Sequence, residues 1–158
     1  MVWLLSYGLA KFSFGQFGLL SPGQLNHTYG QTSPMFLLWT FMAASPGYQL
    51  VGGVAEVQPA LFLLHRRTVT LGALIAVVTI TNVFALNMAY DVPVKLFSFH
   101  LLLAALVLAA YDLPRLLALF TGRVVPAAEW PARTGWGRVW ASWLATVAVL
   151  ALMGQASL

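Results

Sequence analysis

The stretch 68–90 contains no charged residue, and this feature restricts the chain to a few structural classes. A helix needs about 20 mostly apolar residues to cross the hydrocarbon core of a bilayer. Four other long stretches carry at most one charged residue each: 1–17, 46–64, 96–111 and 139–158. The sequence therefore predicts an all-α fold, a polytopic transmembrane helix bundle, with helices at roughly 1–17, 47–64, 69–89, 94–111 and 139–154.

Composition favours the same class. Hydrophobic residues make up 60% of the chain and charged residues only 8%, whereas a soluble domain is nearer half apolar and a quarter charged. The net charge of +4 does not indicate nucleic-acid binding, because the eight basic residues form no stripe with aromatic residues between them. The chain has no cysteine, no HExxH motif and no Gly-rich phosphate loop, so no metal site and no evident cofactor is predicted.

Two further segments are too short or too broken to span. The run MFLLWTFMAA (35–44) lies between Pro34 and Pro46, and we expect an interfacial or re-entrant helix with Trp39 at headgroup level. Segment 112–138 is rich in Pro and Gly. Its start, LPRLLALF, predicts a helix on the membrane surface, and the rest predicts a loop.

Basic residues predict the orientation. Two segments hold six of the eight: Arg66, Arg67, Arg115, Arg123, Arg133 and Arg138. In a five-helix chain, loops 65–67 and 112–138 fall on one side, and segments 18–46 and 90–95 on the other. Because basic loops remain in the cytoplasm, we expect a multi-pass protein of the cell (inner) membrane with 65–67 and 112–138 cytoplasmic. The chain begins apolar without a signal-peptide pattern and stops after the last predicted helix, so we expect a piece of a longer protein.

The stretch LNMAYDVPVKLFSFH (86–100) places Asp91 and Lys95 between two apolar runs. Pro93 suits the first turn of a helix, and Asp91 near its N-cap would accept hydrogen bonds from free N–H groups. One interpretation is a capped helix with a local ion pair. The other is that the pair forms the rim of a binding site in the outer leaflet.

Polar residues of the predicted helices gather at similar depth. Counted from the outer boundaries, Lys11 and His100 lie about 9 Å deep, Asn82 about 12 Å and Glu56 about 15 Å. Polar groups are costly in lipid, so these should face the bundle interior, with Lys11 within reach of Glu56. This pair is either a structural salt bridge or a binding or proton-handling pair. The candidate outer-leaflet polar site comprises Lys11, Gln16, Glu56, Asn82, Asn87, Asp91, Lys95 and His100.

Five blocks of the sequence resemble the DoxX-like integral membrane proteins, most closely the C-terminal half of a longer bacterial branch. They are YGLAKFSFGQF (7–17), YGQTSPMFLLWTFM (29–42), GGVAEV (52–57), RRTVTLGAL (66–74) and NVFALNMAYDVPVKLFSFHLLL (82–103). The resemblance implies a four-helix transmembrane domain over 1–122 with an outer loop or re-entrant segment at 18–46. A cytoplasmic loop at 123–138 and an additional transmembrane helix at 139–158 would follow. The family's motif lysine falls on Lys11, and its YDVPVK block on 90–95.

The family takes its name from a subunit of a thiosulfate:quinone oxidoreductase, and some relatives are associated with redox or oxidative-stress membrane complexes. The resemblance implies a redox-linked membrane subunit whose outer-leaflet cavity binds a quinone or similar amphipathic molecule. Lys11, with His100 or Glu56, would hydrogen-bond a carbonyl oxygen there. The alternative is a non-catalytic scaffold or assembly subunit of a larger complex. The expected partners are the lipid bilayer, partner subunits and such a ligand, and the residues leave open whether the protein is an enzyme.

Overall fold

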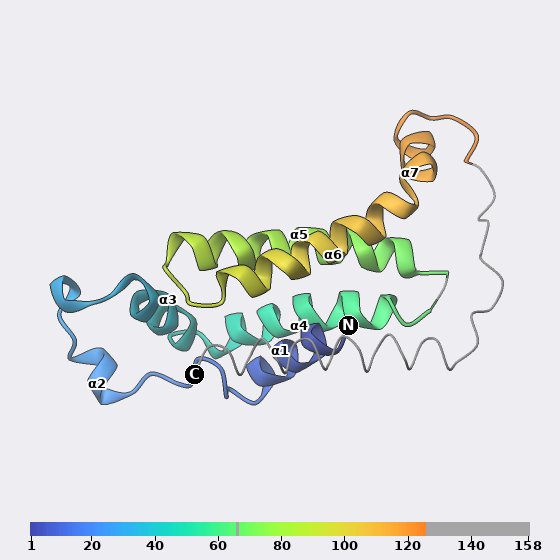
Figure 1. Ribbon diagram of the computed structural model, residues 1–158. Helices are drawn as coiled ribbons and strands as arrows, with labels where there is room; N and C mark the ends of the chain where they lie inside the picture. The colour runs from blue at the N-terminus through green and yellow to red at the C-terminus, as the bar shows by residue number, and fades with distance from the viewer. Residues whose placement is uncertain (66, 126–158) are drawn as a thin grey trace, which may run out of the picture.

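The computed structural model describes residues 1–65 and 67–125, and every regular element in them is helical. The longer helices are α1 (Val2–Phe12), α4 (Pro46–Phe62), α5 (Val69–Ala89) and α6 (Lys95–Tyr111). The shorter ones are α2 (Pro22–Leu25), the 3-10 helix η1 (Tyr29–Gln31), α3 (Pro34–Ala43) and α7 (Leu113–Phe120) (Figure 1). The all-α prediction is confirmed for this part of the chain.

Three Ser–Pro pairs begin the helices between α1 and α5. The side chains of Ser21, Ser33 and Ser45 are N-caps that accept hydrogen bonds from backbone N–H groups three residues later. A proline follows each serine at the first helical position, where its missing N–H costs nothing. These caps divide the segment between α1 and α4 into short helices that change direction at each serine.

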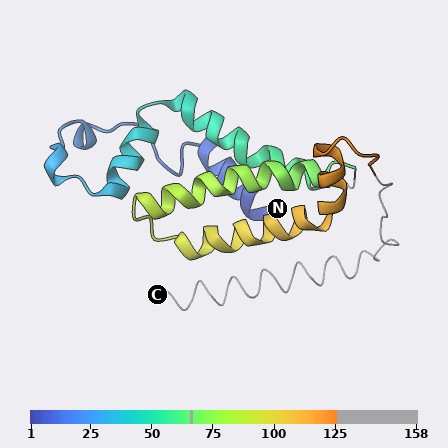
Figure 2. The same cartoon turned by 90° about the horizontal axis from the view of Figure 1, so that it is seen from above.

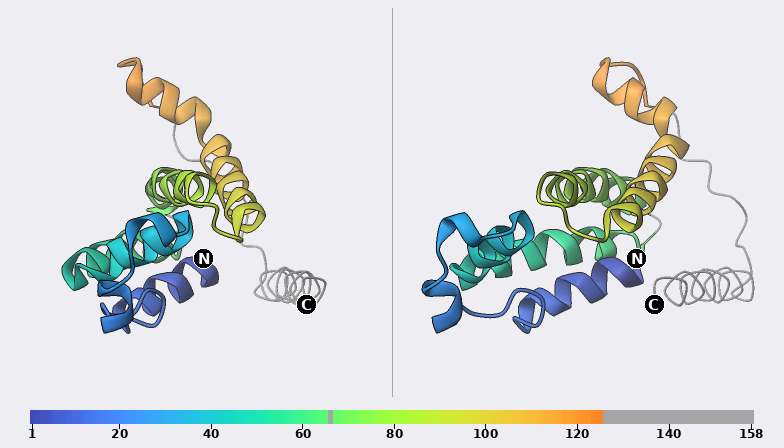
Figure 3. Two further views of the ribbon diagram at one scale, coloured as in Figure 1. Left: turned by 90° about the vertical axis from the view of Figure 1, so that its left-hand side faces the viewer. Right: turned by 60° about the vertical axis from the view of Figure 1, so that its left-hand side comes forward.

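The longer helices pack in chain order, α1 on α4, α4 on α5 and α5 on α6, each antiparallel to the one before (Figure 1). An end-on view shows α1 and α4 on one side and α5 and α6 on the other (Figure 3). The core between them contains three alanines, Ala60, Ala76 and Ala105, together with Leu4 and Ile80. Small residues let helix backbones approach closely, as is common in bundles packed in lipid.

Helix α5 is long and apolar enough to cross a membrane, judged by length and composition. Helices α6 and α7 meet the same criterion only as one span, and they are bent by 70° at Asp112. One such helix, or two with the bent pair, supports membrane association, and the five-span topology stays a prediction. The predicted helix 139–154, Arg66, Arg133 and Arg138 lie outside the described residues.

The prediction of the first helix was wrong at its C-terminal end. Helix α1 stops at Phe12 rather than continuing to residue 17, because Phe14 adopts a φ of 54° that no α-helix accommodates. The 11 residues of α1 cover only about 16 Å. The other predicted boundaries, 47–64, 69–89 and 94–111, agree with α4, α5 and α6 to within two residues. The predicted helices at 35–44 and in LPRLLALF are present as α3 and α7.

Candidate functional site

A cavity of about 530 Å³ lies between α4 and α5, with α3 over its end. The hydroxyl of Thr79 donates a hydrogen bond of 3.2 Å to the carbonyl of Ala55, so the two helices touch at that level. Beyond this contact they separate toward α3 (Figure 2). Leu38, Trp39 and Met42 of α3 line the space that the separation leaves.

Lys11 and Glu56 form a buried ion pair in the wall of this cavity. The Lys11 Nζ donates to Glu56 Oε2 at 2.6 Å, and the two residues are only 5% and 4% exposed. The same ammonium lies 5.6 Å from the centre of the Phe17 ring, within range of a cation–π interaction. Among the described residues, Nζ donates to no second acceptor, so two of its N–H groups remain available. The predicted proximity of Lys11 and Glu56 is confirmed.

Close contact between α1 and α4 positions this pair. A Cβ at Gly8 would lie 2.4 Å from Val57 Cγ2 and 2.9 Å from the Gly53 carbonyl oxygen, so only glycine fits there. Lys11 lies one turn beyond Gly8, and Glu56 one turn beyond Gly53. Side chains lean toward the N-terminus of their own helix, so in an antiparallel pair Lys11 and Glu56 lean toward each other. Nothing in the sequence distinguishes Gly8 from the other glycines, and its role was not predicted.

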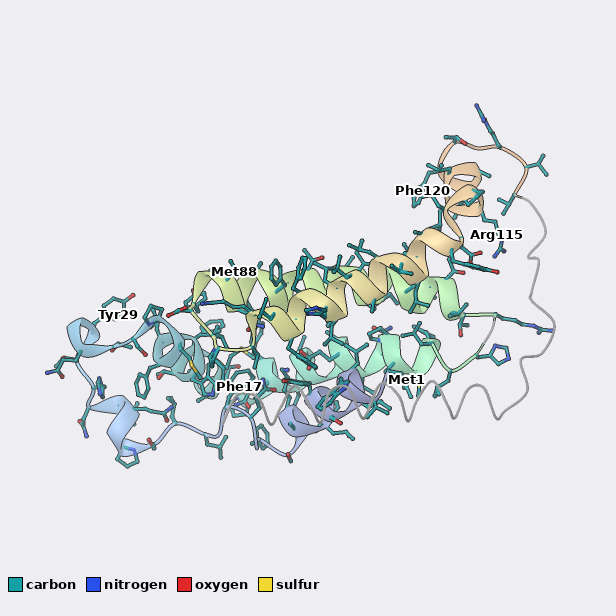
Figure 4. The ribbon with its side chains drawn as sticks, viewed as in Figure 1. Met1, Phe17, Tyr29, Met88, Arg115 and Phe120 are labelled. Atoms are coloured by element: carbon teal, nitrogen blue, oxygen red, sulfur yellow. The ribbon has the colours of Figure 1, made fainter. Side chains whose placement is uncertain are left out.

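The turn after α1 holds α3 in place. The Trp39 indole N–H donates to the Gln16 carbonyl at 3.2 Å, and the Gln49 amide donates to the Gly18 carbonyl at 2.8 Å. The Phe17 and Trp39 rings are in edge contact, with centroids 5.1 Å apart. Figure 4 labels Phe17 at this junction. The turn thus links α1, α3 and α4 around one end of the cavity.

Three buried side-chain polar atoms have no hydrogen-bond partner among the described residues. They are Gln16 Oε1, Thr40 Oγ1 and Gln49 Oε1. An unpaired buried polar atom costs about 1–3 kcal/mol, so a further hydrogen-bonding group is expected beside them. Gln16 itself lines the cavity.

Asn82 and Asn87 contribute amide groups from α5. Asn87 is buried and donates to the Ser98 hydroxyl of α6 at 3.0 Å, which ties α5 to α6. Asn82 is exposed at the wall of the cavity, one turn from Thr79. A second, water-sized cavity of about 30 Å³ lies on the other side of Glu56 and is lined by Tyr7, Asn87 and Ser98.

The expectation that His100 faces the bundle interior was wrong. His100 is exposed on α6, and its Nδ1 lies 2.6 Å from the Leu96 carbonyl oxygen. Leu96, Leu103 and Val107 share this exposed face, being one or two turns away. Depth along a helix does not fix which way a side chain points, and His100 takes no part in the cavity wall.

The prediction that Asp91 caps the following helix was also wrong. The N-cap of α6 is Val94, α6 begins at Lys95, and Pro93 precedes the helix. Asp91 has a φ of 54° in the turn before it, and its carboxylate accepts a hydrogen bond from the Lys95 ammonium. This ion pair was predicted. Both residues lie outside the cavity lining, whereas their neighbour Val92 is buried against Leu38 and Met42.

Five of the eight predicted site residues therefore line one cavity: Lys11, Gln16, Glu56, Asn82 and Asn87. Thr79, Trp39 and Tyr7 also line it and were not predicted as site residues. Thr79 had a usable signal, because it lies one turn from Asn82 on the same helix. Within the described part of the chain, no three His, Asp or Glu side chains lie close enough to hold a metal ion. The arrangement suits a small organic ligand with an oxygen-bearing head.

The chain was also compared with known proteins by sequence and by structure. The chain is 34% identical over 114 residues to Uncharacterized protein YwoB from Bacillus subtilis (strain 168), and the match covers 72% of each protein. No family model matches the chain. No solved structure matches it either.

Proposed function

We propose that this chain, which belongs to the same family as Uncharacterized protein YwoB of Bacillus subtilis, binds a quinone or a similar amphipathic molecule in the cavity beside Lys11 and Glu56. The protein would be a multi-pass subunit of the cell membrane, with the cavity in the outer half of the bilayer and loops 65–67 and 112–138 in the cytoplasm. Its redox link rests on the resemblance to DoxX-like proteins.

The observation that carries the proposal is a buried ion pair in the wall of a mainly apolar cavity. Ligand sites are typically cavities of about 300–1,000 Å³ with apolar walls and a few polar groups, and this one has about 530 Å³. A purely structural ion pair is most stable when protein groups enclose it fully. Lys11 and Glu56 are nearly fully enclosed, yet Lys11 keeps two N–H groups that no described residue accepts.

Some of the cavity-lining residues have specific roles in this proposal. Lys11 would donate a hydrogen bond to a carbonyl oxygen on the ring of the ligand, and Glu56 would hold the ammonium in position. The rings of Phe17 and Trp39 would flank the head of the ligand, because aromatic side chains pack well against a flat ring. Asn82 would contact a second polar atom of the same head.

The test is the quinone content of the protein purified with its native lipid. A solvent extract of the wild type should contain quinone in a constant molar ratio to the chain, measured by its absorbance. The Lys11→Met/Glu56→Leu double variant should lose it, because the polar contacts are removed while the volume is nearly kept. Asp91→Asn, which lies outside the cavity, is the matched control and should retain it. An equal quinone content in all three proteins would contradict the proposal.

A second candidate, a scaffold or assembly subunit, is favoured by one observation. The polar side chains inside the bundle also bond to each other across helices, Lys11 to Glu56 and Asn87 to Ser98. Such bonds lock helices together whether or not a ligand binds. A wild-type protein that carries no ligand, and that loses a co-purifying subunit on mutation of these residues, would favour the scaffold.

A further inference from the structure

The cavity wall changes from buried to exposed across its width. On the inner side, Leu38, Met42 and Glu56 are each at most 6% exposed. On the other side, Val51 of α4 and Val78 of α5 are 63% and 72% exposed, although both line the same cavity. The cavity therefore opens between Val51 and Val78.

The position of this opening is defined by two contacts. On one side, the hydrogen bond from Thr79 to the Ala55 carbonyl joins α4 and α5. On the other, the rings of Phe41 and Tyr48 meet edge to face with centroids 5.5 Å apart. The opening thus lies along the flank of the bundle and not at its end.

Exposed apolar residues continue along α4 and α5 from the opening. Val54 and Leu61 of α4 and Leu71 of α5 are exposed apolar residues of the same helices. Val78 lies near the middle of α5, the helix that is long and apolar enough to cross a membrane. In a bilayer, the opening would therefore face hydrocarbon and not water.

We propose that the cavity is loaded sideways from the bilayer through a portal formed by Val51, Val78 and Asn82, and that its occupant is a ring-headed amphiphile with one long apolar tail. The head lies beside Lys11 and Glu56, and the tail leaves between Val51 and Val78 into lipid. This inference rests on the proposed function. Asn82 supports it, because an exposed amide is costly in hydrocarbon unless a second polar group binds it.

If the tail leaves through the portal, a change at the portal should affect the binding of tailed ligands in particular. A cavity of about 530 Å³ encloses a ring and part of a chain, so most of a long tail must stay outside. A bulky residue at the portal should then hinder a tailed ligand and leave a tailless one free to bind. Val78→Trp is the direct test, and Val78 is exposed enough to accept the larger side chain without repacking of the core. Val51→Trp tests the same portal from α4.

The matched control is Val107→Trp on α6, because Val107 is 70% exposed and lies outside the cavity lining. The wild type and the three variants in lipid nanodiscs are incubated with a long-chain quinone or its tailless analogue, and occupancy is measured by native mass spectrometry. Val78→Trp and Val51→Trp should weaken binding of the tailed quinone roughly tenfold or more. Val78→Trp and Val51→Trp should weaken binding of the tailless analogue far less than binding of the tailed quinone, and Val107→Trp should match the wild type with both probes.

Three results distinguish a failure of the portal from a failure of the proposed function. Equal weakening of both probes by Val78→Trp, or no weakening of either, would overturn the lateral portal while the binding site stands. A wild type that binds neither probe would overturn the proposed function, and the portal with it. Retained binding of the tailless analogue also shows that each variant is folded.

Discussion

Lys11 and Glu56 are 45 residues apart in the chain, yet their Nζ and Oε2 atoms lie 2.6 Å apart between two helices. Two glycines one turn away, Gly8 and Gly53, bring the backbones of α1 and α4 together at this level. The ion pair is therefore a property of the helix contact and not of local sequence. Both side chains are almost fully buried, so neither charge is well solvated when its partner is removed.

Removing one member of this pair should destabilise the protein strongly. We expect Lys11→Met alone and Glu56→Gln alone each to cost about 3–5 kcal/mol of unfolding free energy, because a lone charge or polar group is then stranded in the bundle. The Lys11→Met/Glu56→Leu double variant should recover a good part of that loss. The loss of stability and its recovery are followed as shifts in the thermal aggregation temperature of the detergent-solubilised protein. Losses that simply add in the double variant would show that the two residues do not interact.

Gly8 should tolerate no side chain, in contrast to Gly47. A methyl group at Gly8 would overlap Val57 and the Gly53 carbonyl, whereas nothing lies within 4 Å of a Cβ at Gly47. Gly8→Ala should therefore cost roughly 1–3 kcal/mol through overpacking. Gly47→Ala, on the first turn of α4, should be neutral or slightly stabilising. Equal melting temperatures for the two variants would argue against the close α1–α4 contact.

The ion pair of Asp91 and Lys95 predicts that the stability of the protein depends weakly on pH and falls in acid. The hydrogen bond from Lys95 and its positive charge hold the pKa of the Asp91 carboxyl below its ordinary value of 3.8. The pair's contribution to stability is then present above that ordinary value, and it is lost as the pH falls through the lower pKa of the folded state. It should be small, because the Asp91 side chain is highly exposed.

The measurement is the melting temperature of the wild type minus that of Asp91→Asn between pH 6 and pH 3 in steps. The difference should stay constant above the ordinary carboxyl pKa and shrink at lower pH. Taking the difference cancels the titration of groups common to both proteins. A difference that grows on acidification would mean that the pKa of Asp91 is raised and not lowered.

The helices were predictable from sequence where apolar runs end at clear breakers. Helix α5 was predicted at 69–89 and found at Val69–Ala89, because the run is uninterrupted and charged or polar turns flank it. The end of α1 was missed because the break occurs at Phe14, a residue type with no preference for positive φ. Glycines at 15 and 18 lie just after the break and were too weak a signal.

Part of the site was predictable from the positions of its residues along the predicted helices. Helical rise gave similar depths for Lys11, Glu56 and Asn82, and all three line the cavity. Depth says nothing of direction around the helix, and His100 points away for that reason. The cavity itself was beyond sequence reasoning, because it depends on where the Trp39 bond to Gln16 places α3.

The topology predicts that the two ends of the bundle lie on opposite sides of the membrane. Helices α2 and α7 lie at opposite ends of the bundle (Figure 1), and Arg123 follows α7 by three residues. Because the basic segments should remain in the cytoplasm, a reporter fused at Arg123 should be cytoplasmic, and one inserted within 22–32 extracytoplasmic. Two active reporters on one side would rule out the multi-pass arrangement.

The most direct measurement of the ligand site is native mass spectrometry of the wild type beside Gly52→Leu. The nearest atoms to a Cβ at Gly52 belong to flexible side chains, Lys11 at 3.5 Å and Met42 at 3.9 Å, and Gly52 lines the cavity, so a larger residue there should fill it. We predict that the wild type released from native lipid carries a bound amphiphile in constant proportion, and that Gly52→Leu carries none while its melting temperature is unchanged or higher. An amphiphile retained equally by both proteins, or absent from the wild type, would contradict the assignment of this cavity as a binding site.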